Sequence, residues 1–131
     1  MAVTSNLGYP RLGVKRELKW ALEGYWSGKI SVTDLLKTGK ELRLAHWMIQ
    51  REAGIDIIPS NDFSLYDHVL DTTHMVGATP KRYAQLKNPT DLDLYFAMAR
   101  GAQQGEQTLA AMEMTKWFDT DHRDIVPKLE H

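Results

Sequence analysis

The sequence predicts a helix-rich α/β fold, in which long helical stretches separate two or three short strands. The clearest helical pattern spans residues 35–53, where apolar or small side chains and one histidine recur every three or four positions. Directly after it, the IDIIP stretch (55–59) is a short β-branched run, typical of a strand buried on both faces of a parallel sheet. A helix followed by such a strand predicts a βα unit.

The composition limits the classes of protein to which the chain can belong. With 131 residues, of which 43% are hydrophobic, it has room for one domain with a core. The 16 basic and 17 acidic side chains nearly cancel, so no global field attracts nucleic acid or an anionic membrane. The sequence has no cysteine, no signal-peptide pattern and no apolar run long enough to span a bilayer. We therefore expect a cytoplasmic location.

The start of the chain predicts a strand, a turn and a helix. Residues 4–13 (TSNLGYPRLG) contain two glycines and a proline, which suits a short strand that leads into a turn. Apolar side chains at helical spacing then predict a helix over about 15–27 that ends at Gly28. Ser31 and Asp34 predict a capping box at the start of the next helix. The stripe of that helix comprises Leu35, Gly39, Leu42, His46, Ile49 and Ala53, and Gly54 closes it.

The second half of the chain predicts further helices separated by loops. Within 60–77 a polar start leads into a helix, with Leu65, Val69 and Thr73 on one side. A loop or broken helix is expected at 77–91, followed by a short helix at 92–101. A flexible link at 101–107, a last helix at 108–118 and a strand at 124–127 complete the chain. This inventory holds too few strands for a closed parallel barrel, which needs eight. We expect residues 1–128 to be the opening portion of a larger domain, and Leu129, Glu130 and His131 to be the remnant of a purification tag.

Two cations at the start of the first helix are the best candidates for a binding site. Arg16 and Lys19 share one helical face near an N-terminus, where the backbone dipole already favours an anion. Cations placed there oppose the dipole unless a negative ligand occupies the site, so a phosphate or a ligand with several carboxylates is one interpretation. The alternative is that both are solvated and that Glu17 supplies the favourable charge.

Other polar residues give weaker signals. Lys116 stands beside Trp117 and Phe118 and is either a positioned anion contact or a lysine whose stem lies along the edge of the core. The histidines before the tag show no metal-binding spacing, and no glycine-rich phosphate loop is present. The sequence therefore predicts no metal site in this chain.

Four blocks resemble the N-terminal portion of the cobalamin-independent methionine synthases. They are LGYPRLGVKRELKWALEGYWSGKIS (7–31), GIDIIPSNDFSLYDHVLD (54–71), LYFAMARG (94–101) and MEMTKWFDT (112–120). The resemblance implies a two-barrel enzyme in which this segment begins the N-terminal (β/α)8 barrel. It also implies transfer of a methyl group from a folate with a polyglutamate tail to homocysteine, which is bound as a thiolate on zinc in the C-terminal barrel.

The resemblance also implies a ligand-binding role for particular residues. The folate, 5-methyltetrahydropteroyltriglutamate, is expected to contact Arg16, Glu17, Leu18 and Lys19 of the RELK block, and Lys116 of the TKWF block. Zinc is expected in the full-length family and not in this segment, so we expect no methyl transfer by the chain alone. Residues 121–124 (DHRD) depart from the family pattern, which leaves the role of that loop open.

Two other interpretations stay open for the isolated chain. One is a non-catalytic module that binds folate or another anion. The second is a fragment that covers an unfinished sheet by self-association, since an open parallel edge favours pairing with a second copy.

Overall fold

The computed structural model describes residues 1–87 and 89–130, which form two compact units. The first unit comprises residues 1–65, and the second comprises the described residues from Tyr66 onward. Helices and short strands are both present, so the predicted α/β class is confirmed. Among the described residues, no helix combines the length and the apolar character needed to cross a bilayer.

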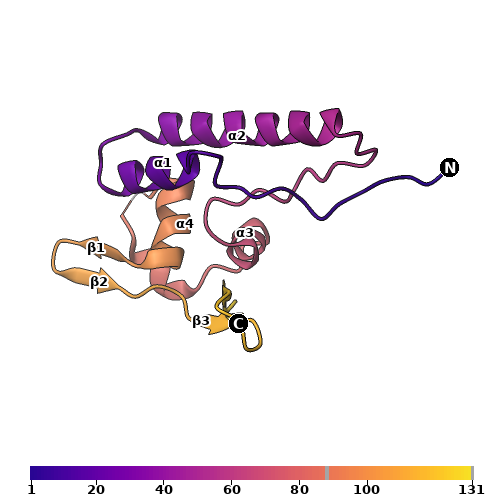
Figure 1. Ribbon diagram of the computed structural model, residues 1–131. Coiled ribbons are helices and arrows are strands. Elements are labelled where there is room, and N and C mark those ends of the chain that lie inside the picture. The colour runs from indigo at the N-terminus through magenta and orange to yellow at the C-terminus, as the bar shows by residue number, and fades with distance from the viewer. Residues whose placement is uncertain (88, 131) are drawn as a thin grey trace. The chain divides into compact units, whose positions relative to one another are not determined.

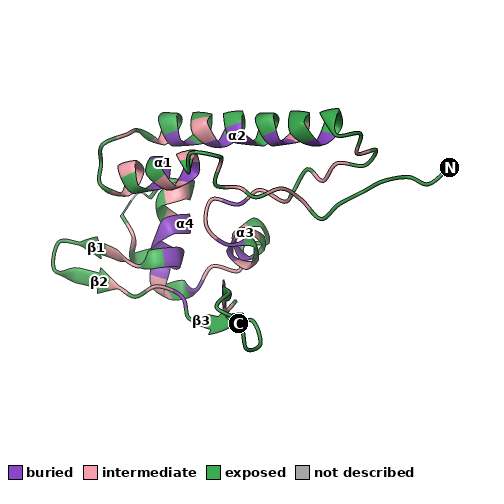
Figure 2. Cartoon of the chain, viewed as in Figure 1, coloured by how far each residue is buried: buried purple, intermediate pink, exposed green. Residues whose placement is uncertain are grey.

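Two helices packed against each other build the first unit. They are α1 (Glu17–Trp26) and α2 (Val32–Glu52), which lie side by side in Figure 1. Figure 2 shows that the buried positions follow one side of α2. The buried residues are Leu18, Ala21 and Leu22 of α1 and Leu35, Gly39, Leu42, His46 and Gln50 of α2.

Both predicted helices are confirmed, with two corrections. The helix α1 begins at Glu17, so Arg16 precedes it with left-handed angles and does not share a helical face with Lys19. The second correction concerns the end of α2. The predicted stripe continued through Ile49 and Ala53, but Ile49 is 42% exposed and Ala53 is also exposed. Gln50 is buried in their place, because its amide bonds Asn6 of the N-terminal segment through a 2.9 Å Nδ2–Oε1 contact. A polar partner far away in the sequence has overridden the local apolar pattern.

The start of α2 is the predicted capping box. The Ser31 hydroxyl accepts a hydrogen bond from the Asp34 backbone N–H (3.1 Å), and the Asp34 carboxylate accepts one from the Ser31 N–H (3.3 Å). The Ser31 hydroxyl also bonds the Asp34 carboxylate, and these bonds lower the pKa of Asp34. Two backbone donors that the first helical turn leaves unpaired are thereby satisfied.

The N-terminal segment runs parallel to the segment that follows α2. Ser5 and Ile57 form a parallel β-bridge, and the Ile57 N–H donates to the Thr4 carbonyl at 3.0 Å. The Asp56 carboxylate accepts the Thr4 N–H at 2.8 Å, and the Asp56 N–H donates to the Thr4 hydroxyl at 3.0 Å. The short strand predicted within 4–13 and the strand predicted at 55–59 are thus reduced to one bridge. The predicted burial of the second strand on both faces is wrong, because Ile57 is 59% exposed.

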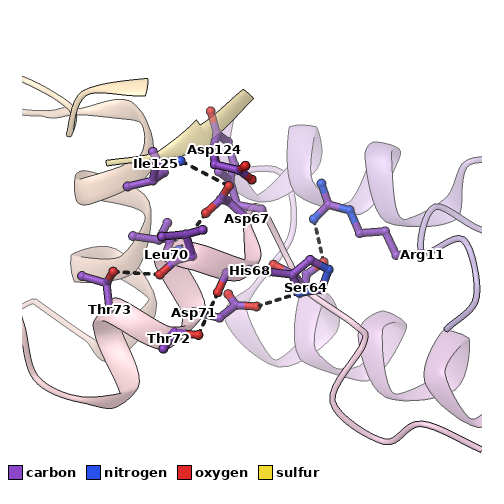
Figure 3. Close-up of polar contacts among 12 residues, drawn as sticks. Arg11, Ser64, Asp67, His68, Leu70, Asp71, Thr72, Thr73, Asp124 and Ile125 are labelled. Atoms are coloured by element: carbon purple, nitrogen blue, oxygen red, sulfur yellow. Dashed lines mark hydrogen bonds and ion pairs between the residues drawn. The ribbon is translucent and has the colours of Figure 1, made fainter. Parts of the chain in front are cut away.

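Side-chain bonds continue this parallel alignment beyond the bridge. The Tyr9 N–H donates to the Asp62 carboxylate at 2.9 Å, and the Arg11 guanidinium donates to the Ser64 carbonyl at 2.7 Å (Figure 3). Residues 4–11 therefore follow residues 56–64 in the same direction, with α1 and α2 in the connection between them. This is the order of elements in a βα unit, built with very little strand ladder.

The second unit packs three short helices. They are α3 (His68–Met75), the 3-10 helix η1 (Lys81–Gln85) and α4 (Asp91–Arg100). The predicted helices within 60–77 and at 92–101 are confirmed, but Leu65 lies before α3, whose buried residues are Leu70 and Thr73 where Val69 was expected. The 77–91 stretch contains the short η1. The core of this unit includes Leu70, Tyr83, Phe96, Met98, Met112 and Ile125.

One buried carboxylate joins α3 to the end of the chain. Asp67 caps α3 by accepting the Leu70 N–H at 2.7 Å, and its second oxygen accepts the Ile125 N–H at 3.3 Å (Figure 3). The Tyr95 hydroxyl donates to the Asp71 carboxylate at 2.6 Å and so links α4 to α3.

Two antiparallel hairpins replace the predicted link and last helix. β1 (Ala102–Gln104) pairs with β2 (Gln107–Leu109), and β3 (Met114–Lys116) pairs with β4 (Arg123–Ile125). The flexible link at 101–107 and the helix at 108–118 are therefore wrong, whereas the strand at 124–127 is confirmed in part.

Glycines at positive φ explain the first hairpin. Gly105 (φ +60°) stands in the two-residue turn between Gln104 and Gln107, where a left-handed conformation suits a tight hairpin. A Cβ at Gly101 (φ +81°) would lie 2.6 Å from the Leu109 carbonyl oxygen, so this position needs glycine where the returning strand passes.

We expect Ser31→Ala to lower the free energy of unfolding by about 1 kcal/mol, because the Asp34 N–H loses its partner. Thr33→Ala is the matched control: Thr33 is exposed in the same helical turn, and we expect a change within about 0.5 kcal/mol. Urea unfolding followed by far-UV circular dichroism measures both. Equal losses in the two variants would show that the capping box does not stabilise α2.

Candidate functional site

The RELK block begins at a tight turn that leads into α1. The Arg16 N–H donates to the Gly13 carbonyl, and the Leu18 N–H donates to the Leu12 carbonyl, both at 3.1 Å. Arg16 is the residue before the helix and has left-handed backbone angles (φ 59°, ψ 37°). For a residue other than glycine this conformation costs about 1–2 kcal/mol, so the surrounding bonds must impose it.

The Arg16 side chain is exposed and makes no capping bond. Within the described residues, no hydrogen bond or ion pair engages its guanidinium. The five N–H donors of an arginine are therefore presented to solvent at the start of a helix, where the dipole adds to their attraction for an anion.

Glu17 folds back onto the turn and is only partly exposed. Its Oε2 atom accepts the Lys15 N–H at 3.0 Å, and a Cβ added at Gly13 would overlap that oxygen. The same Cβ would lie 2.8 Å from a methyl group of Leu42, and Gly13 has φ +83°. Glu17 thus closes the turn that presents Arg16, and it depends on a glycine at position 13.

Lys19 is already engaged along the helix. Its Nζ atom lies 3.8 Å from the Glu23 carboxylate and 5.0 Å from the centre of the Trp20 ring, and the side chain remains 42% exposed. An exposed ion pair at this spacing contributes roughly 0.2–0.5 kcal/mol, so a ligand carboxylate could replace Glu23 at little cost.

Leu18 is part of the core. Its side chain is 0% exposed, and its N–H donates to the Leu12 carbonyl. Leu18 anchors the start of α1 on α2, and its expected contact with folate stays a prediction.

Lys116 belongs to the second unit, where it lies on a strand. It is an exposed residue at the end of β3, opposite Arg123 of β4. The next two residues are also exposed, with Trp117 at 58% and Phe118 at 81%, and their rings meet edge to face at 5.0 Å. Lys116 therefore does not lie along a core edge. Like Arg16, it is free to contact an anion.

The groove between α1 and α2 does not suit an anion. It has a volume of about 600 Å³ and an apolar floor, and its carboxylates belong to Glu17, Asp34 and Glu41. Each carboxylate has a local partner, since Glu41 lies 3.9 Å from the Lys37 ammonium. A polyanionic ligand is therefore expected on the Arg16 side of the helix start.

The sequence did not predict that a buried histidine packs on Tyr9 near this turn. His46 is 7% exposed, and its ring lies 4.6 Å from that of Tyr9, centre to centre. Burial lowers the pKa of His46, and the carboxylates of Asp62 and Glu17 oppose this effect. The sequence placed His46 on the apolar stripe of α2, but nothing in the spacing linked it to Tyr9 or Asp62.

The described residues offer no metal centre. They contain no group of three or more histidine, aspartate or glutamate side chains placed to hold a metal ion, and the chain has no cysteine. Zinc, which the resemblance implies only for the C-terminal barrel, has no fitting group of side chains among the described residues.

Comparison with known proteins identifies the family. The fold and the exposed cations at the start of α1 define a helix-rich α/β segment with a candidate anion-binding turn. The family profile described as "Cobalamin-independent synthase, N-terminal domain" matches residues 3–131. The chain belongs to the cobalamin-independent methionine synthase family.

Curated relatives share high sequence identity with the chain. They include the 5-methyltetrahydropteroyltriglutamate–homocysteine methyltransferases of Flavobacterium johnsoniae (63% identical over 95% of this chain), Xylella fastidiosa (54% over 98%) and Salinibacter ruber (54% over 100%). The matched region covers 16%, 17% and 18% of these relatives, respectively. The chain thus spans less than a fifth of their length.

We expect Gly13→Ala to destabilise the first unit more than Gly28→Ala. Both glycines have positive φ, but only at Gly13 does a Cβ meet Glu17 and Leu42; nothing lies within 4 Å at Gly28. Backbone strain of about 1 kcal/mol is common to both, and Gly13→Ala adds roughly 1 kcal/mol for the lost Glu17 bond. Urea unfolding and the hydrogen exchange of the Lys15 amide measure the difference, and equal costs would contradict the role given to Glu17.

Proposed function

We propose that this chain forms the folate-tail-binding part of an enzyme that transfers a methyl group from 5-methyltetrahydropteroyltriglutamate to homocysteine. The names of its relatives support this reaction, and the unpaired guanidinium of Arg16 carries the binding role. A triglutamate tail supplies several carboxylates, and a planar guanidinium can bind a carboxylate through two parallel hydrogen bonds.

The residues of the RELK block have different roles in this proposal. Arg16 binds a tail carboxylate directly, and Lys19 joins after leaving Glu23. Glu17 keeps the turn closed, and Leu18 fixes the helix to the core. Lys116, which the resemblance also implies as a folate contact, is an exposed cation of the second unit.

We further propose that residues 4–11 and 56–64 correspond to neighbouring strands of a (β/α)8 barrel in a longer cytoplasmic protein. Their parallel course and the helices between them support this arrangement. The thiolate and zinc chemistry belongs to another part of such a protein, because the described residues hold no group suited to a metal. The contribution of this chain is to bind and orient the folate.

We expect Arg16→Ala to weaken binding of 5-methyltetrahydropteroyltriglutamate about tenfold, because a charge-assisted pair is lost. Lys19→Ala and Lys116→Ala should weaken it less, and the monoglutamate form should bind more weakly than the triglutamate. Lys40→Ala, which removes an exposed cation from α2, is the matched control and should leave the affinity unchanged. Isothermal titration calorimetry at fixed ionic strength measures each value.

Two results would contradict this binding role. One is equal affinity for the two folates, and the other is a loss in Lys40→Ala as large as that in Arg16→Ala. Undetectable binding by the unmodified chain would also count against it.

We expect the 131-residue chain alone to form no methionine from methyltetrahydropteroyltriglutamate and homocysteine, even with added zinc. The physical reason is that the sequence has no cysteine and the described residues hold no metal-binding cluster. A mass-spectrometric assay for methionine checks this. Zinc-dependent turnover by the purified chain would overturn the proposed division of roles.

A further inference from the structure

A buried histidine stands directly behind the candidate site. His46 lies on the inner side of α2, and its ring packs on Tyr9 at 4.6 Å with an interplanar angle of 34°. Tyr9 is also held from the opposite segment, because its N–H donates to the Asp62 carboxylate at 2.9 Å. Two independent contacts thus fix Tyr9, which lies at the start of the segment that leads to Arg16.

The path from Tyr9 to Arg16 is short and constrained. A Cβ at Gly8 would lie 2.6 Å from an Asp62 carboxylate oxygen, so the backbone passes close to that side chain. Farther along, Arg11 bonds the Ser64 carbonyl, and Gly13 packs against Glu17. Because contacts hold residues 8–13 at both ends, a shift at Tyr9 would be transmitted to the turn.

Two carboxylates and a phenol surround the imidazole. The titratable groups that face His46 are Tyr9 from the N-terminal segment, Glu17 from α1 and Asp62 from the segment after α2. Both carboxylates already accept backbone N–H groups, from Lys15 and Tyr9 respectively. A proton on His46 would attract the same two carboxylates that keep the turn in place.

We propose that His46 is a positioning residue for the tail-binding turn: its neutral ring holds Tyr9 and thereby residues 8–16, and protonation of the ring loosens them. This inference rests on the proposed function. The physical cause is the cost of a charged imidazole in a buried site, together with competition for Asp62 and Glu17. The consequence is that folate binding weakens as the pH falls from neutral toward mildly acidic values.

The direction of the pH effect follows from the shift of His46. Burial makes its pKa lower in the folded chain than in the unfolded chain, so the folded state binds fewer protons. The stabilisation is complete above the ordinary histidine pKa of about 6.5 and is lost as the pH falls through the folded value. Carboxylates of the ligand remain ionised at about pH 5.5, because their ordinary pKa values lie near 4.

The first test measures binding of 5-methyltetrahydropteroyltriglutamate at about pH 7.5 and 5.5. We expect the unmodified chain to lose severalfold in affinity at the lower pH. His46→Phe keeps a neutral ring against Tyr9, so it should bind within twofold of the unmodified chain at the higher pH and lose the pH dependence. His46→Ala should bind more weakly at both pH values. His68→Gln, which removes an exposed histidine of the second unit, is the control and should keep the original profile.

The second test needs no ligand and therefore separates this inference from the proposed function. Exchange of the Tyr9 amide, corrected for the intrinsic effect of pH, should accelerate at the lower pH in the unmodified chain. It should not accelerate in His46→Phe. If the chain binds no folate, the proposed function fails, but the exchange rate of the Tyr9 amide still tests the role of His46.

Two outcomes would overturn the inference. One is a His46→Phe variant that keeps the pH dependence of the unmodified chain. The other is a Tyr9 amide whose exchange does not change with pH or in His46→Ala.

Discussion

The first unit depends on the parallel alignment of residues 4–11 with residues 56–64. Asp56 and Asp62 make this alignment, because each carboxylate accepts a backbone N–H of the opposite segment. Pro10 and Pro59 lack N–H donors, so a regular ladder cannot form through this region. Side-chain acceptors take its place, and bonds from the Thr4 N–H and hydroxyl lower the pKa of Asp56 and so keep it ionised. With the two segments fixed, the connection between them must return as a helical hairpin.

The candidate site follows this aligned segment in the chain, and bonds within residues 12–18 give it its geometry. The turn before α1 contains a left-handed arginine, which an isolated peptide would rarely adopt. It persists because the Gly13 and Leu12 carbonyls accept bonds from Arg16 and Leu18, and because Glu17 closes the turn. These bonds join residues only two to six positions apart, and the close approach of Gly13 to Leu42 places the turn against α2. Local bonds therefore hold the backbone that presents Arg16 to solvent.

The sequence predicted the features that depend on contacts between nearby residues, and it missed those that depend on contacts between distant ones. The helix α2 and its Ser31–Asp34 box follow from neighbours three or four residues apart, and both were predicted correctly. The region after α4 has apolar side chains at helical spacing, yet it forms hairpins, because pairing between strands and the positive φ of Gly105 decide its structure. Local spacing carries no information on such pairing.

The same limit applies to the candidate site. Arg16 and Lys19 are neighbours in one block, so their conflict with the helix dipole is visible in the sequence. The contact of Tyr9 with His46 joins segments that only the fold brings together, and it left no signal in the spacing. The resemblance to the family located the RELK block, but it could not show that Glu17 faces inward.

The structure also ranks Arg16, Lys19 and Lys116 by how available each is to bind an anion. Lys19 points toward the next turn of α1, where Glu23 balances its charge, so its conflict with the dipole is largely relieved. Lys116 lies opposite Arg123, and two like charges on paired strands favour a negative ligand between them. Among the described residues, Arg16 has neither a carboxylate partner nor a cap, and its backbone is held at a cost in conformational energy. A cation presented at such a cost, with no charge partner in the described part of the chain, is the strongest reason to propose Arg16 as the first contact for an anion.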